Sequence, residues 1–102
     1  MAIGASQPFR PTGTATLAAG TSPAATALQG GGDSVLVFNN SAAVAFIRFG
    51  TDETVIATAA DTPIPPGGRM LLGVNALVRT ASAILAGGAG SVFFTRGDGS
   101  VY

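Results

Sequence analysis

Residues 34–50 read SVLVFNNSAAVAFIRFG, and this stretch decides the fold class. Its first run, residues 34–39, alternates apolar side chains between two faces and stops at the turn residues Asn39-Asn40-Ser41, which predicts a β-strand followed by a turn. Its second run, residues 44–50, is largely apolar on both faces and therefore predicts a strand that is covered on both sides.

Short runs of the same kind alternate with turn clusters along the rest of the chain. Gly, Pro and β-branched residues interrupt the alanine-rich stretches, so no helix is expected. About eight short strands at roughly 8–12-residue spacing are typical of an antiparallel β-sandwich, jelly-roll-like or barrel-shaped, and strand count alone does not give strand order. The six further strands are expected at residues 14–18, 25–28, 54–58, 69–74, 77–85 and 91–95.

Two proline-containing segments are expected to lie outside the central strands. Residues 61–68 can form neither a helix nor a central strand and predict a crossover along a sheet edge. The prolines near the N-terminus push the residues before them towards extended geometry. Residues 1–13 are therefore expected to form an extended N-terminal arm ahead of a β-sandwich domain at residues 14–102. Phe9 would be the apolar anchor of this arm, and a frayed terminus is the alternative.

The composition points to a surface that is covered by other protein. Hydrophobic residues make up 47% of the chain and charged residues 10%, and five Arg balance five acidic residues, which gives a formal net charge of zero. Because free soluble monomers normally rely on a more charged surface, we expect a homo-oligomer or a partner protein.

Nucleic-acid and membrane partners are not expected. The arginines are dispersed and there is no lysine, so the basic patch that nucleic-acid binding needs is missing. No apolar run approaches the roughly 18–20 residues that span a bilayer. The N-terminal residues lack the features of a signal peptide, so a cytosolic origin is the default.

The chain lacks the side chains of the common catalytic and metal sites. It contains no His and no Cys, which excludes Ser-His-Asp and Cys-His arrangements and the usual zinc sites. The adjacent pair Asp52-Glu53 falls short of a calcium loop, and Arg96-Gly97-Asp98 is interpreted as a turn rather than as a cell-adhesion tripeptide. We therefore expect no enzyme activity, no cofactor and no metal. The carboxylates all fall in expected turns: Asp33, Asp52, Glu53, Asp61 and Asp98.

Four segments together carry a resemblance to a known class of proteins: SVLVFNN at 34–40, AFIRFG at 45–50, DTPIPPG at 61–67 and VFFTRGDG at 92–99. The series resembles small β-sandwich virion structural proteins of tailed bacteriophages and prophages, over roughly residues 14–99. The resemblance implies a capsid decoration (cement) protein or another multi-copy accessory of the head or tail. It further implies a partner in the major capsid protein or another virion protein, assembly in the cytoplasm of a bacterial host, and no catalytic residues.

The interface candidates come from the arm and from the dispersed arginines. A clamp made by the arm would use Phe9 and Arg10. Arg48, Arg69 and Arg79 are expected to make charge-assisted contacts at junctions between subunits, with ordinary solvated side chains as the alternative. Tyr102 is either a loose end or an interface plug.

The sequence is compatible with other functions. A tail or vertex accessory, a connector, or a host-surface binding module are the rival functions, although the shortage of Trp and Tyr speaks against glycan binding. An enzyme is the remote third alternative, which a conspicuous pocket holding two carboxylates would revive. Four phenylalanines are expected in the core rather than in a sugar-stacking platform: Phe46, Phe49, Phe93 and Phe94.

Overall fold

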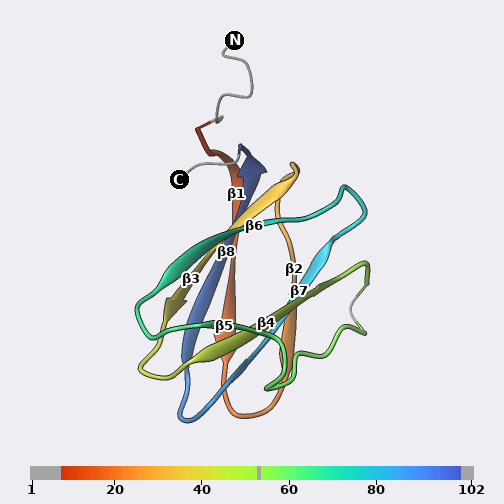
Figure 1. Cartoon of the computed structure of the whole chain (residues 1–102). Helices are drawn as coiled ribbons and strands as arrows, with labels where there is room; N and C mark the ends of the chain where they lie inside the picture. The colour runs from red at the N-terminus through yellow and green to blue at the C-terminus, as the bar shows by residue number, and fades with distance from the viewer. Residues whose placement is uncertain (1–7, 53, 100–102) are drawn as a thin grey trace.

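The computed structural model describes residues 8–52 and 54–99, and these form an all-β domain (Figure 1). No helix occurs within these residues. Eight strands make up two four-stranded sheets, which pack face to face. The strands are β1 (Arg10–Ala19), β2 (Ala24–Ala27), β3 (Ser34–Asn40), β4 (Ala45–Gly50), β5 (Thr62–Ile64), β6 (Arg69–Gly73), β7 (Thr80–Leu85) and β8 (Gly90–Asp98).

The strand order is that of a jelly roll. The first sheet has the order β1-β8-β3-β6 and the second has the order β2-β7-β4-β5, with every neighbouring pair antiparallel. Strands pair as β1 with β8, β2 with β7, β3 with β6 and β4 with β5, so the chain is one long hairpin wound into two sheets. Figure 1 shows the first and last strands, β1 and β8, side by side. The predicted antiparallel β-sandwich is confirmed, and the jelly-roll order follows from the pairing.

The core lies between the sheets, and both sheets contribute large and small side chains to it. Phe94 of β8 is the largest fully buried side chain, and its ring meets that of Phe49 edge-on, with centroids 6.2 Å apart. Alanines on the facing strands leave room for such a ring, as close packing requires. The buried core cluster is Leu17, Ala19, Val35, Val37, Ala45, Ile47, Ile64, Ala81, Ala83, Leu85, Val92 and Phe94.

A buried amide fixes the turn between β3 and β4. The Asn39 side chain has no exposed surface, and its Nδ2 donates to the carbonyl oxygens of Ala43 at 2.7 Å and of Ile64 at 3.0 Å. Its Oδ1 accepts the Ser41 hydroxyl at 2.6 Å. This one side chain therefore supplies hydrogen-bond donors to carbonyl oxygens of the β3–β4 turn and of the end of β5. Buried main-chain groups need such partners.

The first strand begins earlier than the sequence predicts. β1 starts at Arg10, whose partner in the register is Asp98, so residues 10–13 of the expected arm are part of the sheet. Pro11 is tolerated because β1 is an outer strand and the register shifts between Pro11 and Gly13. The remainder of the expected arm, residues 1–7, lies outside the described residues.

The fifth strand is not where alternation placed it. Of the predicted strand at 54–58, the described residues form no strand, and β5 is instead the short Thr62–Ile64 segment. Pro63 lacks an N–H but is acceptable because β5 is the outer strand of its sheet. The prediction that the proline segment follows a sheet edge is therefore consistent with the structure, whereas the strand at 54–58 is wrong.

Candidate interaction surface

Part of the outer face of the second sheet is covered by the chain's own loop between β4 and β5, at residues 54–61. Ala57 of this loop is 1% exposed, and its N–H donates to Ser82 Oγ at 2.9 Å. The Ser82 hydroxyl in turn donates to the Ala24 carbonyl oxygen at 2.8 Å. Nearly every residue of β7 is therefore buried although the strand belongs to a two-layer sandwich.

An ion pair fastens the far end of this loop to β4. Arg48 Nε lies 3.0 Å from Asp61 Oδ1, and Asp61 Oδ2 accepts the Thr58 N–H at 2.7 Å. Burial raises the pKa of Asp61, but the hydrogen bonds from Thr58 and the Arg48 guanidinium outweigh burial and hold this pKa below its ordinary value of 3.8. Arg48, an expected partner contact, is thus engaged within its own chain with half of its side chain exposed.

The outer face of the first sheet carries an apolar patch, made of Leu36, Phe38, Leu71 and Phe93. The register places Phe93 opposite Phe38 and Leu71 opposite Leu36, so their side chains share one face. The rings of Phe38 and Phe93 stack with centroids 6.0 Å apart. All four residues keep partial exposure, in contrast to the buried Ala57 and Ser82 across the molecule.

Polar residues border the apolar patch on both sides. On the β1 side, Thr16 is opposite Phe93 and Thr14 is opposite Thr95, whose hydroxyl is 3.1 Å from that of Thr14. On the β6 side, Arg69 is opposite Phe38. An apolar centre with a polar rim is the usual anatomy of a protein–protein contact, so this face is the candidate interaction surface.

Arg96 closes one end of the sandwich. It is only 5% exposed, and its guanidinium donates to the Gly32 carbonyl oxygen through Nε at 3.0 Å and Nη2 at 2.9 Å. It also donates to the carbonyl oxygens of Asn75, at 3.2 Å, and of Val78. The guanidinium therefore ties the β2–β3 and β6–β7 loops to β8 through main-chain carbonyl oxygens.

The Arg96-Gly97-Asp98 tripeptide is part of β8 rather than a turn, which corrects the sequence interpretation. Gly97 is needed there because a Cβ would collide with the Arg10 carbonyl oxygen on β1. With Arg96 buried and Gly97 inside the sheet, the tripeptide does not present itself as an exposed adhesion loop.

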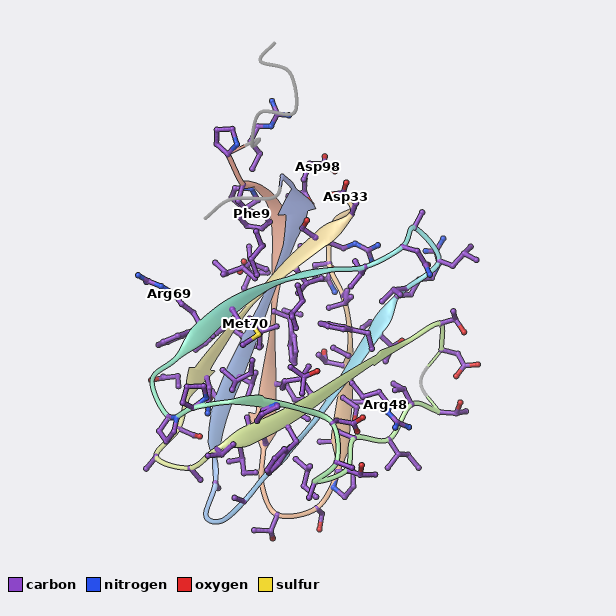
Figure 2. The ribbon with its side chains drawn as sticks, in the orientation of Figure 1. Phe9, Asp33, Arg48, Arg69, Met70 and Asp98 are labelled. Carbon is purple, nitrogen blue, oxygen red and sulfur yellow. The ribbon has the colours of Figure 1, made fainter. Side chains whose placement is uncertain are left out.

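A pocket of about 420 Å³ lies beside Arg96 at this end of the molecule. Figure 2 shows Asp33 and Asp98, which line it, close to one another at the top of the view. Arg79 and the glycines at 30–32 complete much of the wall, and none of the lining residues is aromatic. Within the described part of the chain, no three acidic side chains gather as a metal site would require.

The structure separates the predicted interface residues. Arg69 lies at the rim of the apolar patch and Arg48 lies on the opposite sheet, well apart from it (Figure 2). Arg79 lines the loop-end pocket, so the three arginines form no common site. Phe9 is partly buried, with its backbone against Gly99. Arg10 is an exposed residue of β1, and Tyr102 lies outside the described residues.

Sequence reasoning missed the apolar patch and Arg96. Phe49 and Phe94 belong to the core as predicted, whereas Phe46 and Phe93 face outward, Phe46 on the second sheet and Phe93 on the first. The alternation of Val92, Phe94 and Arg96 continues through β8 and was the available signal for an inward-facing arginine.

No protein-family model matches the sequence, and no curated protein or solved structure matches it either. In residues 8–52 and 54–99 no helix has the length and apolar character needed to cross a membrane. The case for function therefore rests on the surface of the molecule.

Proposed function

We propose that this chain is a non-enzymatic structural protein of a bacteriophage particle, acting as a capsid decoration (cement) protein. The observation that carries the proposal is the apolar patch on the first sheet, on a chain in which only 10% of residues are charged. The opposite outer face is covered in part by residues 54–61, around the buried Ala57. The sequence resemblance to virion proteins supports the same role, and the partner is the major capsid protein.

The size of the apolar patch favours a role in many copies. Burying what remains exposed of its four side chains, on the order of 150 Å², contributes about 4 kcal/mol at ~25 cal/mol per Å². Association costs of ~4–15 kcal/mol are comparable or larger. One patch therefore binds weakly, and stable attachment needs further contacts from neighbouring subunits, as a shell provides.

Copy number tests this proposal. The measurement is quantitative mass spectrometry on purified particles of the phage or induced prophage that encodes the chain. A ratio close to that of the major capsid protein supports decoration of the shell. About a dozen copies or fewer would move the protein to a vertex, connector or tail position, and absence from the particles would overturn the virion role.

The predicted arm is tested separately, by deleting residues 2–7. This deletion leaves β1 whole because the strand starts at Arg10, whereas a deletion through residue 13 would damage the sheet. Undiminished binding of the shortened protein to particles would show that the arm is not a clamp.

A binding module is the second candidate, and the loop-end pocket is the observation that favours it. The pocket holds Asp33, Asp98 and Arg79, groups that orient a small polar ligand. It has no aromatic ring to stack on a sugar. Titration of the protein with a panel of glycans, followed by amide NMR at residues 30–33, distinguishes this role from shell decoration.

A further inference from the structure

The outer edge of β6 is the least protected sheet edge of the molecule. β6 pairs with β3 on one side, and in residues 8–52 and 54–99 no strand pairs with its other side. The other outer strands are guarded. The β2–β3 loop lines part of β1, where the Thr12 hydroxyl donates to the Gly31 carbonyl oxygen at 2.6 Å. β2 has only four residues, and β5 has three and contains Pro63.

The pattern of hydrogen bonds between β6 and β3 shows which main-chain groups of β6 face the open edge. The Val74 N–H donates to the Asp33 carbonyl oxygen at 2.8 Å, on the β3 side. Residues of an antiparallel strand alternate between pointing their main-chain groups at one neighbour and at the other. Met70 and Leu72 therefore point their N–H and C=O groups at β3, and Leu71 and Gly73 point theirs at the open edge.

The side chains of β6 do not block pairing. Met70 is 37% exposed, and Leu71 and Leu72 are partly buried. Native sheets commonly guard an open edge with lysine, proline or an inward-pointing charge. β6 reads RMLLG, so its only charge is Arg69 at its first position.

We propose that the open edge of β6 pairs antiparallel with the β6 edge of a second copy of this chain. With a two-fold axis at Leu71, Leu71 faces its own copy, Met70 faces Leu72, and Arg69 faces Gly73. The two Arg69 side chains lie at opposite ends of the pair, so like charges do not meet. A formal net charge of zero removes long-range repulsion between copies. The edge fits a second copy because the antiparallel pairing is self-complementary along RMLLG and keeps its one charge, Arg69, at the two ends.

The pairing joins the two apolar patches, because Leu71 belongs to both the edge and the patch. Five residues from each copy bury on the order of 600 Å² in total, below the ~1,200 Å² of a stable interface. The dimer is therefore weak in solution, with a Kd on the order of 0.1–1 mM. The dimer becomes stable where other contacts already hold two copies of the chain close together. The inference does not depend on a virion role, because a weak dimer is measured on the purified chain alone.

Amide hydrogen exchange and sedimentation velocity, from about 10 μM to about 1 mM, test the pairing. The expected result is reversible dimerisation, with amide protection at Leu71 and Gly73 that rises with concentration while Met70 and Leu72 are protected throughout. A chain that stays monomeric over this range, or a dimer in which Leu71 and Gly73 gain no protection, overturns the proposal.

Leu71→Pro and Leu71→Ala form a matched pair of variants. Leu71→Pro removes the outward N–H while leaving the β3 ladder intact, and it weakens dimerisation by about tenfold or more, since both copies lose a donor. Leu71→Ala keeps the N–H and retains more of the association. Equal dimerisation of wild type and Leu71→Pro would place the contact on another surface. The exchange measurement on the wild type decides the matter if the proline variant does not fold.

Discussion

Arg96 is the residue through which one end of the sandwich is closed, because its guanidinium joins carbonyls of two loops to β8. Arg96→Met keeps most of the stem but leaves the carbonyl oxygens of Gly32, Asn75 and Val78 without this donor. Each buried group left unsatisfied costs about 1–3 kcal/mol. We expect a loss of about 3 kcal/mol in the free energy of unfolding, measured by urea denaturation.

Arg79→Met is the matched control for Arg96→Met, because Arg79 lines the same pocket but is exposed. Its expected effect is within about 0.5 kcal/mol. If the two variants were equally stable, Arg96 would have no structural role, and its charge would instead be available to a ligand in the pocket.

Asp61 gives the fold a defined dependence on pH. Its pKa in the folded chain is below 3.8, so the ionised carboxylate contributes fully above about pH 4, and the contribution is lost as the pH falls through the folded-state pKa. Asp61→Asn is expected to lower stability at about pH 7 by less than about 1 kcal/mol. The gap to wild type should close towards about pH 2.

Urea midpoints at both pH values measure the effect of Asp61→Asn. Asp98→Asn is the control, because Asp98 is exposed and has no salt bridge within 4.0 Å in the described residues. A stability gap for Asp61→Asn that is the same at both pH values would mean that the ionised carboxylate is not what fastens residues 58–61 to β4.

At the scale of elements, the loop at residues 54–61 covers part of the outer face of the second sheet. Ser82→Ala leaves the buried Ala57 N–H without its acceptor, at a cost of about 1–3 kcal/mol. We expect faster hydrogen exchange at the Ala57 amide and a lower free energy of unfolding. Ser91→Ala, on the outer face of β8, is the control with little change. An unchanged Ala57 exchange rate in Ser82→Ala would show that apolar packing alone holds the loop.

Local alternation was enough to predict the class and most strands, because period-two patterning is a property of each segment. It failed at residues 54–58, whose alternation resembles that of a strand, because pairing depends on neighbours distant in the sequence. Thr62–Ile64 became β5 because an outer strand tolerates proline on its unpaired side. The sequence predicts a turn at Asn39, whereas the buried hydrogen bonds of its side chain to Ile64 and Ala43 depend on tertiary packing.

The candidate surface was harder to predict than the fold for a related reason. In β3 both faces are apolar, so the sequence does not say whether Val37 or Phe38 points inward. That choice depends on which face of the first sheet packs against the second sheet, which is a property of the topology. The dispersed arginines were the more visible signal, and the structure places them on separate surfaces.

At the scale of the whole molecule, the two outer sheet faces differ, and this difference makes the docking face testable. Phe93→Thr places a threonine on β8 opposite Thr16 of β1. The substitution removes much of the apolar patch and leaves the core side chains unchanged. We expect binding to particles that lack the protein to weaken by about tenfold or more, because lost apolar burial of ~60 Å² per copy is worth about 1.5 kcal/mol.

Ala25→Thr supplies the matched control for Phe93→Thr, because it places the same side chain on an exposed position of the second sheet. Its binding should equal that of wild type, and thermal unfolding of both variants separates binding from folding. If Phe93→Thr binds as tightly as Ala25→Thr, then the first sheet does not face the shell. The edge of β6 would then be the next surface to test. Leu71→Pro impairs binding of the protein to particles only if copies of the chain must pair through β6 on the particle.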